Sequence, residues 1–197
     1  MPTSETTDAP APTRPRLHRF TAREYHAMGR AGVLRPGVRT ELVHGHILAM
    51  SPIGFRHALV VERLTDLFYD LYRQHGRVRV QSPLALGPRS ESGPDVMLLR
   101  PDAPATRLPR PADVLLVVEV SDATLAFDRD VKAPLYACGG VPELWLVDVA
   151  ARAVEVHRAP EGGAYTVRET HGVGAMLAPT LLPGAAPVAL DALFDGL

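Results

Sequence analysis

The sequence predicts an α/β (α+β) fold with a central mixed β-sheet and helices that flank it. Two runs, residues 94–99 and 114–120, are almost entirely aliphatic, which is typical of central strands covered on both faces. Residues 57–75 carry apolar side chains at the spacing of one helix face. A second helical run, residues 128–138, separates two strand-like runs, which favours a crossover connection and therefore a mixed sheet.

The chain before residue 18 differs in composition from the rest. Residues 1–17 contain four prolines and little that a core can bury, so we expect a disordered leader there. The chain has 197 residues and a hydrophobic content of 46%, which is enough for a substantial core. We therefore expect one domain over residues 18–197.

Three helices are expected from apolar periodicity and from end signals. Thr21 and Glu24 have the spacing of a capping box that starts the first helix, and Gly32 is suited to end it. The second helix has Gly76 as its stop signal. Pro134 lies inside the third run, so it must occupy the first turns or kink the helix. The three ranges are residues 22–30, 57–75 and 128–138.

The other periodic segments read as β-strands. His44-Gly45 is a dipeptide suited to a tight turn and predicts a hairpin, and Gly162-Gly163 predicts a second one. These hairpins are expected as additions to the two ends of the core. The expected strands are residues 40–43, 46–50, 77–86, 94–99, 114–120, 143–149, 154–158 and 164–168.

Composition argues against a membrane-spanning or secreted protein. The longest apolar stretch, residues 114–118, is far shorter than the roughly 20 residues that cross a bilayer, and no apolar run of a signal peptide is visible. The lone Cys138 can form no internal disulfide and lies among small residues, so we expect a buried, unreactive thiol and a cytoplasmic protein. With a net charge of −1, a nucleic-acid partner would have to be held by a local patch.

One position stands out among the basic residues. Of the 21 lysines and arginines, only Lys132 is a lysine. An arginine-favouring codon bias is one explanation. The other is that this position needs an amine, because lysine is a compact charge on a flexible stem, whereas arginine offers a fixed planar fork. The surroundings of Lys132 have to decide between them.

Two acids lie in the aliphatic strands. Asp95 opens the second of the three strands that follow the long helix, and Glu119 closes the third. Buried carboxylates need a partner, and a divalent cation suits two at once. If the strands pair, both acids can share a metal at one sheet edge. The alternative is that each acid faces solvent, caps a turn or pairs with an arginine. With Lys132 on a nearby helix, the set would suit phosphodiester hydrolysis.

At these residues the chain resembles the Uma-two family, a bacterial branch of the restriction-endonuclease-like PD-(D/E)XK superfamily. The resemblance covers a little over half of the chain and rests on an ordered set of blocks. They are Glu41-Leu42-Val43-His44-Gly45, Met50-Ser51-Pro52-Ile53-Gly54 with His57, Gln81-Ser82-Pro83, Pro94-Asp95, Val118-Glu119-Val120-Ser121, Asp128 with Lys132 and Tyr136, and Gly140-Val141-Pro142-Glu143-Leu144-Trp145-Leu146-Val147-Asp148.

The resemblance implies roles for individual residues. Asp95 and Glu119 would be the metal-binding acids, and the carbonyl of Val120 would complete the metal shell. The superfamily lysine usually lies two residues after the second acid, where this chain has Ser121. Lys132 on the following helix would supply the amine instead.

Two further residues are open candidates for the catalytic set. Glu41 is either an additional acid or an exposed strand residue paired with an arginine. His57 either faces the scissile phosphate or is a polar helix cap. The family commonly has an acid at the position of His46, which we expect to be a surface residue here. Trp145 and Tyr136 are expected to pack in the core rather than stack on bases.

The resemblance implies a restriction-endonuclease-like core and a Mg²⁺- or Mn²⁺-dependent endonuclease acting on DNA. The alternative is a nuclease-fold protein that no longer cuts and serves as a nucleic-acid-binding or protein-binding module. A Schiff-base enzyme using Lys132 would need a carbonyl-substrate pocket, for which no signal is found. The strand edges of the two hairpins also favour a homodimer.

Overall fold

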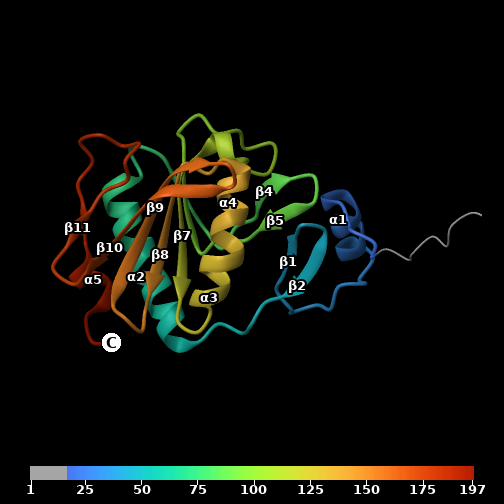
Figure 1. Ribbon diagram of the computed structural model, residues 1–197, viewed down its shortest axis with the longest axis horizontal. Helices are drawn as coiled ribbons and strands as arrows, with labels where there is room; N and C mark the ends of the chain where they lie inside the picture. The colour runs from blue at the N-terminus through green and yellow to red at the C-terminus, as the bar shows by residue number, and fades with distance from the viewer. Residues whose placement is uncertain (1–16) are drawn as a thin grey trace, which may run out of the picture.

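The computed structural model describes residues 17–197, so the predicted leader, apart from Leu17, lies outside the described residues. Helices cover both faces of a central sheet, and a smaller sheet lies beside it (Figure 1). The elements are α1 Ala22–Arg30, β1 Thr40–Val43, β2 His46–Ala49, α2 Phe55–Tyr72, β3 Arg77–Val80, β4 Leu84–Gly87, β5 Ser90–Ser92, β6 Val96–Leu99, the 3-10 turn η1 Pro111–Asp113, β7 Val114–Ser121, α3 Leu125–Phe127, the π-turn η2 Asp128–Lys132, α4 Ala133–Gly139, β8 Glu143–Asp148, β9 Ala153–Glu161, β10 Ala164–Gly172, β11 Met176–Leu177, β12 Val188–Ala189 and α5 Leu190–Phe194.

The central sheet has the strand order β10-β9-β8-β7-β6-β3. Strands β7 and β8 run parallel, with Glu119 opposite Leu146, and the other neighbouring pairs of this sheet are antiparallel. The connection between β7 and β8 passes through η2 and α4, which is the predicted crossover. The mixed α/β fold expected from the sequence is therefore confirmed.

The two faces of the sheet carry separate apolar cores. Strand β7 alternates, so Val118 and Val120 pack with α2 and the C-terminal helix on one face. Val117 packs with Tyr136 and Ala137 of α4 on the other face. The same alternation directs Glu119 to the α4 face. Burial of both faces explains why β7 reads as a continuous aliphatic run.

The first hairpin belongs to a second sheet with the order β2-β1-β5-β4. Its turn residues His44 and Gly45 have φ values of 50° and 83°, the left-handed pair that a tight hairpin turn requires. A Cβ atom at Gly45 would lie 2.6 Å from the Cβ atom of Arg19, so space as well as backbone conformation demands glycine there. The predicted hairpin is thus confirmed, but it does not extend the central sheet.

Some predicted boundaries are wrong. The strand expected over residues 77–86 is two strands in different sheets, β3 and β4, because Gln81 adopts a φ of 44° and Pro83 has no N–H for a ladder. The short strand β5 was not expected. The long helix spans Phe55–Tyr72 rather than residues 57–75, and a non-helical turn leads to Gly76.

The predicted helix over residues 128–138 is interrupted. A π-turn, η2, precedes α4, and its wide turn is closed by the N–H of Ala133 donating to the carbonyl of Asp128. Pro134 has no N–H to donate to the carbonyl of Asp130, and its ring clashes with a carbonyl four residues earlier in a regular helix. The π-turn removes this conflict, so Pro134 explains the irregularity.

The environment of Cys138 was also predicted wrongly. Its side chain is exposed on α4, with its Sγ atom 3.9 Å from the carbonyl of Gly163. Small neighbours therefore did not indicate burial. Among residues 17–197, no helix is long and apolar enough to cross a membrane.

His157 offers a test of the core that is independent of any activity. Its side chain is 1% exposed in β9, and burial lowers its pKa, while a hydrogen bond with Glu155 opposes the shift. The unfolded chain therefore binds a proton more readily below about pH 6.5, so stability should fall as the pH falls from about 7 to 5. We expect His157→Gln to flatten this part of the profile. Urea unfolding at pH 5, 6 and 7 checks it, and equal pH slopes for both proteins would contradict it.

Candidate active site

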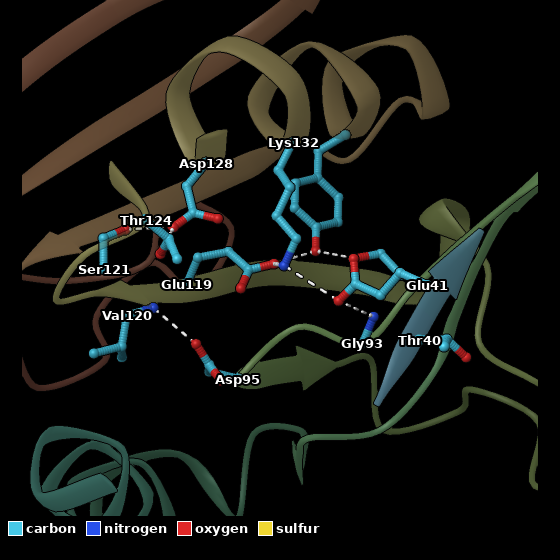
Figure 2. Close-up of polar contacts among 12 residues, drawn as sticks. Thr40, Glu41, Gly93, Asp95, Glu119, Val120, Ser121, Thr124, Asp128 and Lys132 are labelled. Carbon is cyan, nitrogen blue, oxygen red and sulfur yellow. Dashed lines mark hydrogen bonds and ion pairs between the residues drawn. The ribbon is translucent and has the colours of Figure 1, made fainter. Parts of the chain in front are cut away.

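The candidate site lies where the end of β7 meets the start of β6 and the helical turn above them (Figure 2). Glu41, Asp95, Glu119 and Lys132 are each 3% exposed. Buried ionisable groups at this density need one another or a ligand to offset the cost of leaving water. Their contacts define what the site can do.

Asp95 is held by two neighbouring elements. Its Oδ2 atom accepts a 2.9 Å hydrogen bond from the N–H of Val120, and its Oδ1 atom lies 3.1 Å from Nε2 of His57. Burial raises the pKa of Asp95, while the Val120 N–H, His57 and Lys132 oppose the shift. His57 is therefore no simple helix cap, because it contacts a predicted metal ligand.

Lys132 joins two acids that come from different sheets. Its Nζ atom lies 2.8 Å from Oε1 of Glu119 and 3.3 Å from Oε1 of Glu41. Burial alone would lower the pKa of Lys132, but these carboxylates and Asp128 outweigh it and raise the pKa. The side chain is therefore a cation held in place. A protonated amine between two acids is a poor carbonyl nucleophile, which argues against Schiff-base chemistry.

Glu119 has the opposite balance. Burial raises its pKa to about 8, with Asp95, Glu41 and Asp128 adding to the shift and Lys132 opposing it. The hydroxyl of Tyr136 donates a hydrogen bond to the Oε1 atom of Glu119. Because the pKa of Glu119 lies near neutral pH, a further positive charge nearby, such as a metal ion, would favour loss of its proton.

Glu41 is not the exposed, arginine-paired residue of the alternative interpretation. The Ser92 hydroxyl donates to its Oε2 atom at 3.0 Å, and the N–H of Gly93 donates to its Oε1 atom at 3.2 Å. Ser92 is the last residue of β5, the neighbour of β1 in the second sheet, and Gly93 follows it. The second sheet therefore contributes one acid to the site.

A pocket of about 230 Å³ opens onto this cluster. It is lined by Asp95, Glu119, Val120, His57 and Lys132 among others, so it brings five of the six predicted site residues together. Glu41 instead lines a neighbouring hollow of about 180 Å³. Glu41 therefore reaches Lys132 from the second sheet without lining the main pocket.

The residues present fit a hard divalent cation. Asp95 and Glu119 offer carboxylate oxygens, and Mg²⁺ commonly takes one or two carboxylates and completes its shell with water and substrate phosphate. The N–H and C=O of a strand residue point to the same side, so the Val120 carbonyl faces the side of Asp95. Within residues 17–197, however, no three His, Cys, Asp or Glu side chains form a ready metal-binding group.

Two contributors to the site, Tyr136 and Asp128, were undervalued in the sequence. Tyr136 packs in the core as expected, but its hydroxyl also contacts Glu119 and Ser92. Asp128 was noted only as part of a motif, yet it is buried at the pocket wall. Trp145 is a core residue and His46 is exposed, both as expected.

Comparisons with known proteins agree with this architecture. A sequence model described as "Uma2: Putative restriction endonuclease" matches residues 22–191. A solved structure described as a "putative nuclease belonging to DUF820" from Anabaena variabilis ATCC 29413 superposes with a TM-score of 0.62. It is 13% identical, and the match covers 79% of this chain and 89% of the other, so it supports the fold alone. A search of curated proteins found no match.

Proposed function

The chain belongs to the Uma2 family of restriction-endonuclease-like proteins, and on this premise we propose that it is a Mg²⁺- or Mn²⁺-dependent endonuclease acting on DNA. The observation that carries the proposal is the meeting of Asp95, Glu119 and Lys132 at one pocket. Two carboxylates can hold the metal that assists phosphodiester hydrolysis, and an amine can stabilise negative charge on the phosphate.

Each residue then has a role set by its contacts. Asp95 and Glu119, with the Val120 carbonyl, would hold the metal. The metal, when bound, neutralises charge on the phosphate and lowers the pKa of a coordinated water. Lys132 would donate hydrogen bonds to the attacking water or to a phosphate oxygen. His57 would orient Asp95 from a distance of 3.1 Å, and Glu41 would orient Lys132 from 3.3 Å.

The proposal is tested by incubating plasmid and single-stranded DNA with the protein in Mg²⁺ or Mn²⁺, with a chelator as control. Cleavage that requires the metal and is lost in Asp95→Ala and Lys132→Ala is the expected result. Equal activity in the three proteins, or none in any of them over a wide set of substrates, would refute it. A homodimer stays a prediction. The molar mass of the protein, measured by light scattering during size-exclusion chromatography, checks it.

Metal binding can be measured without any substrate. We expect Mn²⁺ to bind the wild-type protein, and Asp95→Asn to weaken binding by at least about tenfold, since even outer-shell changes cost 10- to 100-fold. Calorimetric titration gives the affinities. Asp130→Asn is the matched control, because Asp130 is an exposed acid on the same helical turn as Lys132. Equal Mn²⁺ affinities for the wild type and Asp95→Asn would contradict the assignment.

One observation favours a second candidate function. The ammonium group of Lys132 already satisfies Glu119 and Glu41, as a structural ion pair would in a nuclease fold that binds nucleic acid or protein without cutting. Such a module would bind DNA equally well with and without a divalent metal. Metal-independent DNA binding together with absent cleavage would support this alternative.

A further inference from the structure

The single lysine of the chain is carried by an irregular helical turn. The π-turn Asp128–Lys132 begins at one buried ionisable residue and ends at the other. Because Pro134 has no N–H, the turn lacks the hydrogen bond that a regular helix would make to the carbonyl of Asp130. Side-chain contacts at the start of the turn can therefore help to set the direction in which Lys132 points.

Asp128 is fixed at several points. Its Oδ2 atom accepts hydrogen bonds from the hydroxyls of Ser121 at 2.7 Å and Thr124 at 2.6 Å. Its N–H donates to the carbonyl of Thr124 at 3.0 Å, and its own carbonyl accepts the N–H of Ala133. Hydrogen bonds to a charged acceptor are stronger than those between neutral groups. The start of the π-turn is therefore held by its side chain and by its backbone.

Strand β7 supplies both attachment points of the turn. Glu119 and Ser121 are two residues apart, so they project to the same face of the strand, beneath the turn. Glu119 pairs with Lys132 at one end of the turn, and Ser121 donates to Asp128 at the other end. Figure 2 shows these two contacts side by side under the helix. Ser121 also occupies the position, two residues after Glu119, where the superfamily usually has its lysine.

We propose that Asp128 is a positioning residue, which with the Ser121 and Thr124 hydroxyls anchors the π-turn and thereby directs Lys132 onto Glu119 and Glu41. The hydroxyl at position 121 does not replace the amine. It holds the segment that delivers the amine from the following helix. Only the catalytic consequence of this inference rests on the proposed nuclease function.

Lys132 can be followed selectively, because it is the only lysine. Acetylation by a limiting amine-reactive ester, read by peptide mass spectrometry, separates Lys132 from the chain's α-amino group. A protein labelled with ¹³C at the lysine Cε position gives one lysine side-chain signal. In the wild type, the buried ammonium should be acetylated slowly, and its signal should differ from that of a free lysine.

In Asp128→Ala, we expect Lys132 to be acetylated about 10- to 100-fold faster, as loss of one or two charge-assisted hydrogen bonds implies. Its Cε signal should move towards that of a solvent-exposed lysine. Asp130→Ala removes an exposed acid from the same turn and should leave both readouts unchanged. An Asp128→Ala protein that stays folded with wild-type acetylation and an unmoved signal would overturn the proposal. So would equal acceleration in Asp130→Ala.

A milder pair of variants keeps the test decisive if Asp128→Ala does not fold. Thr124→Val removes one hydroxyl and should speed acetylation, whereas Thr124→Ser keeps it and should restore the wild-type rate. Val156→Ala, in the core on the other face of the sheet, is the control for a loss of stability that does not involve the turn. If Val156→Ala exposes Lys132 as much as Thr124→Val does at equal melting temperature, the positioning role is refuted.

The catalytic consequence is measured separately. With DNA as substrate, Thr124→Val should lower kcat about tenfold with KM unchanged, and Thr124→Ser should recover it. A fall in DNA affinity alone would contradict the positioning role. If the wild-type protein cleaves nothing, the proposed nuclease function fails, while the acetylation rates still decide whether Asp128 positions Lys132.

Discussion

Replacing Asp95 by Asn is expected to reduce metal-dependent DNA cleavage by about 10³-fold. The change keeps the shape of the side chain and leaves an oxygen for the Val120 N–H, which now lies 2.9 Å from Oδ2. It removes the negative charge that would hold the metal. Loss of one preorganised electrostatic contact to a transition state lowers kcat by about 10²- to 10³-fold. We expect loss of a metal ligand to lower the cleavage rate by the larger of these factors.

Lys132→Arg should be nearly as inactive as Asp95→Asn, although it preserves the charge. The Nζ atom fits between two carboxylates with 3% of the side chain exposed, and a planar guanidinium needs more room and a different donor geometry. This result would separate the need for an amine from an arginine-favouring codon bias. Initial cleavage rates at saturating Mn²⁺ measure both variants.

Asp130→Asn serves as the control for a lost acid, because the Asp130 side chain is exposed and does not line the pocket. It should cleave DNA like the wild type. Cleavage by Asp95→Asn within threefold of the wild type, after the chain is shown to be folded and free of contaminating nuclease, would remove Asp95 from the active site.

The two central acids and the lysine were visible in the sequence because each departs from its surroundings. Asp95 and Glu119 are charged residues inside aliphatic strands, and Lys132 is chemically unlike every other basic residue of the chain. Residues that differ in this way from their neighbours can be recognised from the sequence without knowledge of the fold. Strand alternation then accounts for why Glu119 and Lys132 face one another.

The remaining partners depend on contacts that no local pattern records. Glu41 lies in a second sheet, and its burial depends on Ser92, a residue 51 positions away in the chain. Helical spacing predicts that the Tyr136 ring packs in the core, but it gives no sign that the Tyr136 hydroxyl contacts Glu119. The division of residues 77–86 between two sheets depends on a positive φ at Gln81, which is rare for a residue other than glycine or asparagine.

The orientation of the amine was unpredictable for a different reason. A regular helix through residues 128–138 would place Lys132 by a fixed rotation of about 100° per residue. The extra residue in the π-turn shifts this phase, and Pro134 was the sole local signal for it. Sequence periodicity therefore located the helix but not the direction of its most informative side chain.

Lys132→Met is expected to destabilise the fold by about 3–5 kcal/mol at pH 9, because removing one partner of a buried ion pair leaves uncompensated charge. Glu119 and Glu41 would then lie in the core without their cation. The pKa of Glu119, already raised by burial to about 8 from an ordinary 4.5, would rise further without the lysine. The folded variant then binds more protons than the unfolded chain at neutral pH, so its stability falls as the pH rises.

The deficit of Lys132→Met relative to the wild type should therefore be smaller at pH 6 than at pH 9, where Glu119 must ionise. Urea unfolding at both values measures it. Arg129→Met removes a half-exposed cation from the same turn and should cost about 1 kcal/mol or less at either pH. Adding Glu119→Gln to Lys132→Met should recover much of the loss, since a neutral amide can still accept the Tyr136 hydrogen bond. Equal deficits at both pH values, with no recovery in the double variant, would mean that Lys132 is not what balances the buried charge of these acids.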